Sequence, residues 1–297
     1  MIATGALLHG DVPRHLQFDA SEHPVALQLG GSDPTDLARA AKLGQDWGYD
    51  EINLNCGCPS DRVQRGAFGA CLMAQPNAVA SCVKAMQDAV TVPVTVKHRL
   101  GLDWDEDYGP LRDFVGTLHQ AGVQVFIVHA RNAVLKGLSP KDNRSIPPLR
   151  YSVAQRLITD FPDALFVLNG GLANTHETLD QLQTFKGVML GRAAWHSPAI
   201  LRELQHALWP EQATIDDDAI IARMTTYAAD QVRQGVPLRF VARTMLGWAN
   251  GMPGARQWRQ MLSDAQRLNT NDPELISEAW RLLQDRRRQA VDQTTAT

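Results

Sequence analysis

One cysteine lies where a buried strand is followed by a loop of small residues. Cys58 belongs to the run Asn55-Cys56-Gly57-Cys58-Pro59-Ser60, directly after the apolar stretch 51–55. A thiol at the end of such a strand can act as a general acid or as a nucleophile. The other interpretation of Cys58 is a buried, inert thiol. Inert thiols are what we expect at the three remaining cysteines, Cys56, Cys71 and Cys82.

The four cysteines also bear on metals and disulfides. They all fall within residues 56–82, whereas the disulfide framework of a secreted protein spreads through a small domain. We therefore expect reduced thiols. A C-x-C zinc site is the alternative, but neither a second cysteine pair nor a nearby histidine cluster completes four ligands. We predict no metal.

Polar groups end several other apolar runs. Lys97 and His129 are cationic or polar groups that can stabilise negative charge on a cofactor. The segments 169–171 and 191–192 bring glycines to the last two run ends, where α/β barrels commonly bind phosphate through backbone N–H groups. Each residue alone also fits a solvated strand end or a turn. Their recurrence on successive runs indicates one shared site.

The elements that must position these groups alternate along the chain. Six short apolar runs are typical of buried parallel strands, at residues 25–29, 51–55, 94–97, 125–129, 165–169 and 188–192. Helical patterns lie between them, at residues 35–48, 77–90, 111–121, 152–161 and 175–185. A doubly wound sheet would use one glycine-rich loop near its first strand. Polar ends on every run favour a (β/α)8 TIM barrel, whose site lies at the C-terminal strand ends.

The strand count predicts an incomplete barrel. Residues 1–4 supply at most a stub, so the runs make seven strands, whereas a closed barrel has eight. Beyond residue 208 the β-rich runs stop, and helices are predicted at residues 216–234, 238–250, 255–268 and 273–289. We expect an α/β barrel domain over residues 1–208, without its first strand, and a small C-terminal helical domain over residues 209–297.

Charge is distributed unevenly along the chain. The net charge of -3 combines a surplus of acidic residues before residue 233 with ten arginines against six acidic residues from there onward. Arginine is well suited to bidentate contacts with phosphate. Arg256 and Arg259 share one helix face, and Lys141 and Arg144 lie in the long loop after the run that ends at His129. Both pairs also fit an ordinary solvated surface.

Composition limits the class of protein. The 297 residues are 44% hydrophobic and 21% charged, which is ordinary for a globular protein and fits neither a disordered chain nor a coiled coil. The chain has no apolar run long enough to span a membrane and does not begin like a signal peptide. We expect a cytoplasmic protein without a membrane partner. The sequence leaves the oligomeric state open, and we favour a monomer.

The sequence resembles the flavin-dependent tRNA-dihydrouridine synthases, in particular the A-type branch that acts on positions 20 and 20a of the D-loop. The resemblance rests on motifs in the same order along most of the chain, at residues 25–31, 51–61, 96–101, 128–131, 139–149, 169–171 and 191–192.

The resemblance implies a reaction and its residues. Reduced FMN delivers a hydride to carbon 6 of the uracil, Cys58 protonates carbon 5, and NADPH regenerates the flavin. The implied FMN contacts are Gln28, Lys97, His129, Asn169, Gly170, Gly171, Gly191 and Arg192. The implied tRNA contacts are Asn55, Lys141, Arg144, Arg256 and Arg259. Arg99 and Arg131 are expected near the site without an assigned role.

One departure from the family leaves other functions open. Members of the family begin with a strand ending in Pro-Met and a following Thr-Asp that contacts FMN, and nothing in this sequence matches it. We expect the chain to start inside the second strand of the family fold and to bind FMN more weakly for that reason. The alternatives are an FMN-barrel reductase of a small molecule and a non-catalytic tRNA-binding protein.

Overall fold

The chain forms two compact units. The computed structural model describes residues 1–295, and side chains as far as residue 289. The barrel unit comprises residues 1–172 and 180–189, and the helical unit comprises residues 173–179 and those from 190 onward. Residues 190–208 therefore belong to the same unit as the C-terminal helices. The expected division into a catalytic domain up to residue 208 and a tRNA-binding domain from residue 209 concerns function and stays a prediction.

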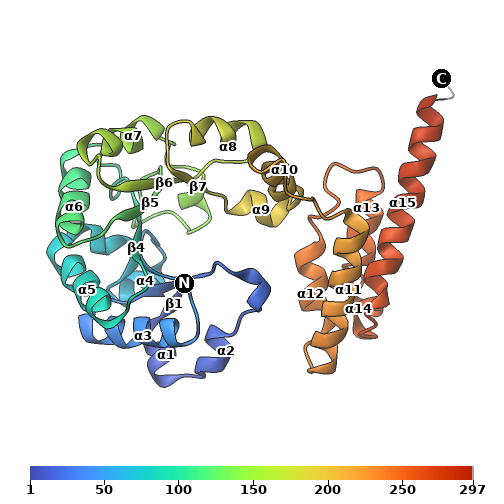
Figure 1. The fold of residues 1–297 in the computed structure, drawn as a ribbon, viewed down its shortest axis with the longest axis horizontal. Helices are drawn as coiled ribbons and strands as arrows, with labels where there is room; N and C mark the ends of the chain where they lie inside the picture. The colour runs from blue at the N-terminus through green and yellow to red at the C-terminus, as the bar shows by residue number, and fades with distance from the viewer. Residues whose placement is uncertain (296–297) are drawn as a thin grey trace. The chain divides into compact units, whose positions relative to one another are not determined.

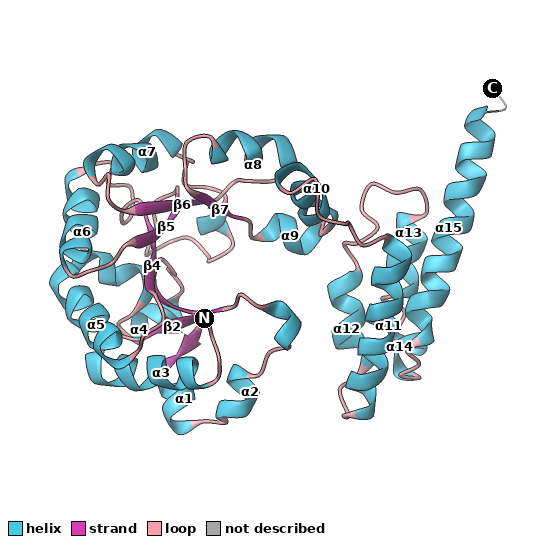
Figure 2. Ribbon diagram, viewed as in Figure 1, coloured by secondary structure: helices cyan, strands magenta, loops and turns pink. Residues whose placement is uncertain are grey.

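A parallel sheet organises the barrel unit (Figures 1 and 2). Within residues 1–295 it has seven strands in chain order, each pairing in parallel with the next. The strands are β1 (Ile2–Ala3), β2 (Ala26–Gly30), β3 (Glu51–Cys56), β4 (Val94–Arg99), β5 (Val125–His129), β6 (Leu165–Asn169) and β7 (Gly187–Met189). The predicted α/β architecture, with six strands and an N-terminal stub, is confirmed.

Helices cover the outer side of this sheet (Figure 2). Those drawn on the outer side include α3 (Pro34–Asp46), α5 (Pro76–Ala89), α6 (Gly109–Gln120) and α7 (Tyr151–Asp160). The same part of the chain also forms α1 (Thr4–His9), α2 (Val12–Leu16), α4 (Asp61–Arg65) and α8 (Thr175–Leu182). Helix α8 crosses the division between the two units. Short 3-10 turns occur at Ala20–Glu22, Gly69–Ala74 and Asp142–Arg144. The sequence did not indicate α1, α2 or α4.

Helix α3 shows why these segments are helical and how they pack. The Asp33 carboxylate caps its first turn by accepting the N–H of Asp36 at 2.8 Å. Leu37 and Gly44 lie on its buried face. A Cβ atom at Gly44 would lie 2.5 Å from Leu27 Cδ2 on β2, so the glycine allows the helix to approach the sheet closely. The barrel core therefore lies between the strands and their covering helices.

Five helices form the core of the helical unit, preceded by α9 (Arg192–His196) and α10 (Ala199–Leu208). The five are α11 (Asp217–Arg233), α12 (Leu238–Met245), α13 (Ala255–Met261), α14 (Ala265–Asn269) and α15 (Glu274–Thr295). Trp258 is fully buried among them, and its indole Nε1 donates to Met245 O at 2.9 Å. Trp280 packs edge-on against it, with ring centroids 6.1 Å apart.

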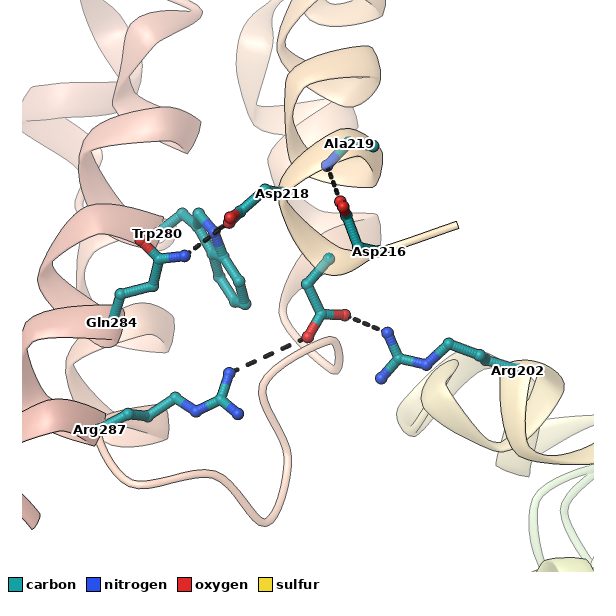
Figure 3. Close-up of polar contacts among 8 residues, drawn as sticks. Arg202, Asp216, Asp218, Ala219, Trp280, Gln284 and Arg287 are labelled. Carbon is teal, nitrogen blue, oxygen red and sulfur yellow. Dashed lines mark hydrogen bonds and ion pairs between the residues drawn. The ribbon is translucent and has the colours of Figure 1, made fainter. Parts of the chain in front are cut away.

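The first turn of α11 ties two other helices to it (Figure 3). Asp217 accepts from Arg202 of α10 at 2.5 Å and lies 4.0 Å from Arg287 of α15. Asp218 Oδ1 accepts from Trp280 Nε1 at 2.5 Å and from Gln284 Nε2 at 2.6 Å. Because these carboxylates lie at a helix N-terminus, they also complement its dipole.

Four predicted elements end at least three residues earlier than expected, and one of them is the helix predicted over residues 175–185, which ends at Leu182. The strand predicted over residues 188–192 stops at Met189, because its neighbour β6 is followed by two glycines in left-handed conformations. The helix predicted over residues 255–268 is broken, because the Asp264 carboxylate caps a new helix by accepting the N–H groups of Gln266 and Arg267. The helix predicted over residues 238–250 ends at Met245, before the close approach of Gly247 to the backbone of α9.

A buried histidine lies between the sheet and α6. His98 is inaccessible to solvent and packs against the rings of Phe114 and Phe126. Its Nδ1 lies 2.7 Å from the Arg99 carbonyl oxygen, and its Nε2 has no partner among the described residues. Burial lowers the pKa of His98 to about 4. The imidazole is therefore neutral at physiological pH.

We predict that His98 makes the barrel unit sensitive to acid. Its folded pKa lies below the ordinary value of 6.5, so the unfolded chain binds the extra proton between pH 6.5 and pH 4. Acidification through this window should lower the free energy of unfolding by roughly 2–3 kcal/mol through His98. His98→Asn keeps a donor for the Arg99 carbonyl but cannot be protonated, and should lose less stability.

Urea unfolding at several pH values measures the difference. His9→Asn, at an exposed histidine, is the control and should behave like the unsubstituted protein. Equal acid losses in His98→Asn and the unsubstituted protein would contradict the prediction.

Candidate functional site

The turn that carries Cys58 is fixed by its own strand end. Asn55 Oδ1 accepts the N–H of Gly57 at 3.1 Å and the N–H of Cys58 at 3.0 Å. The Asn55 amide nitrogen donates to Gln28 Oε1 on β2 at 2.8 Å. The Cys58 carbonyl accepts the N–H of Ala70 at 2.9 Å. The Cys58 backbone is thereby held from both sides, while its side chain is partly exposed.

Arg99 joins this turn to two other segments. Its guanidinium donates to Gly57 O at 3.2 Å from Nε, and to Asn132 O at 3.0 Å and Asn143 O at 2.9 Å from Nη1. Arg99 is 3% exposed. One buried side chain at the end of β4 therefore fixes backbone from the Cys58 turn, from the segment after β5 and from the loop 137–149.

The loop 137–149 is held by its own buried asparagine. Asn143 is inaccessible to solvent; its Oδ1 accepts the N–H of Val134 at 2.7 Å and its Nδ2 donates to Val134 O at 2.9 Å. Lys141 and Arg144, on either side of Asn143, are exposed. This geometry is not that of a merely solvated turn. Contact of Lys141 and Arg144 with tRNA stays a prediction.

Two cations of the barrel unit lie in poorly solvated surroundings. Lys97 Nζ donates to Asn169 Oδ1 at 2.7 Å. Burial, and then the charge of Arg99, lower the pKa of Lys97 to about 7. Burial lowers the pKa of Arg99 to about 10, although the neighbouring Cys58 acts in the opposite direction. In the described part of the chain neither cation forms an ion pair with a carboxylate, so the site has the charge to accept an anion.

The glycine pair after β6 allows a close approach to His129. Gly170 and Gly171 have φ angles of +104° and +77°, which glycine adopts without strain. A Cβ atom at Gly170 would lie 2.5 Å from His129 Cδ2, and one at Gly171 would lie 2.4 Å from Leu149 Cδ1. Tyr151 Oη donates to Gly170 O at 2.7 Å. Glycine is thus required at both positions, because the φ angles are positive and because a Cβ atom would overlap a neighbouring side chain.

The predicted FMN contacts fall in both compact units. Gln28, Lys97, His129, Asn169, Gly170 and Gly171 belong to the barrel unit, and hydrogen bonds link Lys97 to Asn169 and Gln28 to Asn55. The remaining two, Gly191 and Arg192, are exposed and form the start of α9 in the helical unit. All eight assignments stay predictions.

The predicted tRNA contacts differ in exposure. Arg256 and Arg259 are exposed on α13, and Arg259 Nη1 donates to Asn250 Oδ1 at 2.8 Å. Asn55 is 8% exposed, and both ends of its amide are engaged within the barrel unit. The structure therefore gives Asn55 a part in holding the Cys58 turn, which the sequence did not indicate.

The other three thiols differ from Cys58 in their surroundings. Cys56 and Cys82 are buried, and Cys71 is half-buried. Burial raises the pKa of all three, that of Cys82 to about 11. They therefore stay protonated near neutral pH. Among the described residues, no group of three His, Cys, Asp or Glu side chains is arranged to hold a metal ion.

Sequence reasoning missed several residues that build the site. Gln64 Nε2 donates to Pro59 O at 2.7 Å and to Leu135 O at 2.8 Å, which holds the residue after Cys58. Asn132 Nδ2 donates to Asp103 O at 3.2 Å. The sequence offered one indication of these residues, which was the place of Asn143 among the charged residues of segment 141–144.

No helix in residues 1–295 has the length and apolar character needed to cross a membrane.

Fold and site together define a class of protein, an α/β barrel with polar and ionisable side chains gathered at the C-terminal ends of its strands. Residues 1–284 match the family model described as dihydrouridine synthase, and the chain belongs to this family. The expected resemblance is therefore confirmed at the level of the family.

Relatives named tRNA-dihydrouridine(20/20a) synthase occur in several bacteria. The chain is 52% identical to that of Pseudomonas syringae pv. tomato over 285 residues, which cover 96% of this chain and 85% of the relative. It is 50% identical to that of Synechocystis sp., with coverages of 94% and 84%, and 47% identical to that of Salmonella typhi, with coverages of 97% and 87%.

We predict that Arg99→Lys destabilises the barrel unit by about 2–3 kcal/mol, because lysine cannot donate to three carbonyl groups in this geometry and leaves buried acceptors unpaired. Hydrogen exchange at the Cys58 and Val134 amides should accelerate. Urea unfolding measures the free energy, with Arg39→Lys on the exposed face of α3 as the control. A loss no larger than that of Arg39→Lys would contradict the prediction.

Proposed function

We propose that this protein reduces uridine to 5,6-dihydrouridine in the D-loop of tRNA, at positions 20 and 20a. Membership in the dihydrouridine synthase family and the names of the relatives support the reaction and the substrate. The single observation in the fold that carries the proposal is Cys58, a partly exposed thiol whose backbone is fixed by Asn55 and Ala70, beside the buried charge of Arg99. A fixed acid beside an anion-accepting site suits this reduction.

The residues of the barrel unit fit an anionic cofactor, which we propose is FMN. Lys97 is half-buried and Arg99 is buried, and neither has a carboxylate partner in the described residues. An anion would raise the pKa of Lys97 back toward its ordinary value. Lys97, His129 and Asn169 would hold the cofactor, together with Gln28 and the backbone of Gly170 and Gly171. Bound FMN supplies the hydride for carbon 6 of the uracil. Gly191 and Arg192 are proposed as further contacts, and NADPH as the reductant.

Cys58 supplies the proton for carbon 5 in this proposal. Its fixed backbone orients the thiol before the substrate binds, which removes an entropic cost from the proton transfer. A base within a folded RNA must leave its stack to reach such a group. Arg99, which holds the carbonyl of Gly57, keeps the turn in place and stabilises negative charge on the sulfur after the proton has left.

Exposed cations would hold the tRNA. Lys141 and Arg144 lie in the loop that Asn143 fixes in the barrel unit, and Arg256 and Arg259 lie on α13 in the helical unit. Contacts from such residues to phosphate position an RNA without reading its sequence. We propose Asn55 as a further tRNA contact, at the turn that its side chain holds. We further propose that the enzyme works as a monomer in the cytoplasm, on tRNA and without a metal.

We predict that Cys58→Ala binds FMN and tRNA but forms dihydrouridine about 10²- to 10⁴-fold more slowly, the usual effect of removing a positioned general acid. The measurement is the anaerobic rate at which unmodified tRNA reoxidises the reduced flavin. Cys71→Ala, which removes a half-buried thiol nearby, is the control. Near-normal rates in Cys58→Ala would remove this residue from the acid role, and absence of bound flavin in the unsubstituted protein would favour a non-catalytic function.

We also predict that Arg256→Ala combined with Arg259→Ala weakens tRNA binding. Each lost phosphate contact should reduce the slope of log affinity against log salt by roughly one unit. Flavin reduction by NADPH should not change. Titrations of labelled tRNA at several salt concentrations measure the slope, and Lys84→Ala, at an exposed lysine of α5, is the control. Unchanged affinity and slope would indicate that both arginines belong to an ordinary solvated surface and do not contact tRNA.

A further inference from the structure

Ser60 lies against the sulfur of Cys58. The Cys58 Sγ donates to Ser60 Oγ at 3.6 Å, within hydrogen-bonding distance for sulfur. Ser60 occupies the N-cap position of α4, where a serine side chain usually accepts a backbone N–H of the first turn. Here it makes no such bond. The hydroxyl is instead directed toward the thiol, two residues away.

The backbone between the two side chains is fixed. Gln64 holds the Pro59 carbonyl, and the Ser60 carbonyl accepts the N–H groups of Val63 and Gln64, both at 2.9 Å. Cys58 is itself held by Asn55 and Ala70. These backbone contacts keep the Cys58 and Ser60 side chains within reach of each other. The two side chains meet without a large conformational change.

Proton transfer changes the Cys58 sulfur from a hydrogen-bond donor into a hydrogen-bond acceptor. In the proposed reaction the S–H bond breaks, its electron pair stays on sulfur, the proton bonds to carbon 5, and the hydride that bonds to carbon 6 comes from the reduced flavin. The thiol is a weak donor, whereas the thiolate is a charged acceptor that gains more from a hydrogen bond. A hydroxyl can rotate from accepting to donating without moving its oxygen. The Ser60 hydroxyl, which already accepts from this sulfur, is able to do this.

We propose that the Ser60 hydroxyl accepts the Cys58 S–H in the resting protein and donates to the Cys58 thiolate after proton transfer, and then passes a proton from water back to the sulfur. This inference rests on the proposed function, because it concerns the same acid. Ser60 is partly exposed, so water reaches its hydroxyl. The proton that returns the thiolate to the thiol comes from that water, which leaves hydroxide to the solvent.

Alkylation of Cys58 tests the inference without relying on turnover. The rate at which iodoacetamide modifies Cys58, followed by mass spectrometry of its peptide, rises with pH as the thiolate forms. In Ser60→Ala the midpoint of this curve should move up by about one pH unit, the effect of losing one hydrogen bond to a charged group. Ser60→Thr keeps a hydroxyl and should restore the midpoint. Ser81→Ala, an exposed serine on α5, is the control and should leave the curve unchanged.

Turnover provides the second measurement. Ser60→Ala should slow the reoxidation of reduced flavin by tRNA by between about threefold and tenfold, with unchanged tRNA affinity, and Ser60→Thr should recover the rate. An alkylation curve of Ser60→Ala that coincides with that of the unsubstituted protein would overturn the inference. So would a Ser60→Thr curve that coincides with Ser60→Ala, since the effect would then come from packing.

The two proposals fail in different ways. If Cys58→Ala forms product normally, the proposed acid is wrong whatever the alkylation curves show. If Cys58→Ala fails and the curve of Ser60→Ala is unshifted, only the role of Ser60 falls.

Discussion

The buried guanidinium of Arg99 is the interaction on which the site depends. Three carbonyl groups, from Gly57, Asn132 and Asn143, converge on it from separate segments of the barrel unit. A buried cation is costly unless its donors are satisfied, and carbonyl oxygens satisfy them without neutralising the charge. The positive charge therefore stays available beside Cys58 and Lys97. One residue thus joins three segments of the barrel unit and places a positive charge beside Cys58.

Much of the fold could be predicted from local patterns. Strands β5 and β6 have the bounds that their apolar runs indicate, because each buries apolar side chains at its interior positions and ends in a polar residue, His129 or Asn169. The stub at residues 2–3 and the helical C-terminal region also follow from the sequence. The position of Cys58 after β3 was predictable for the same reason, since the strand end and the turn residues are adjacent in the chain.

The remaining features depend on contacts between residues far apart in the sequence. Arg99 bonds to a carbonyl 44 residues away, and no local pattern marks which carbonyl that is. Asn55 was assigned to tRNA by resemblance, but its amide bonds to Gln28 across the strands, which a strand pattern does not show. Short helices such as α4 and the break before α14 depend on single caps and turns. Helical propensities are weak, so a single cap or turn can decide where a short helix begins or ends. A hydrophobic pattern alone therefore does not locate these helices.

In the proposed reaction a fixed thiol supplies the proton, and a flavin held in the anion-accepting barrel site supplies the hydride, for reduction of a uridine of tRNA. The most direct measurement is mass spectrometry of nuclease fragments from an unmodified tRNA transcript after incubation with the purified protein, FMN and NADPH. Fragments containing positions 20 and 20a should gain the mass of two hydrogen atoms per reduced uridine, and all other fragments should be unchanged. NADPH oxidation without any gain in fragment mass, or a gain confined to uridines outside the D-loop, would contradict it.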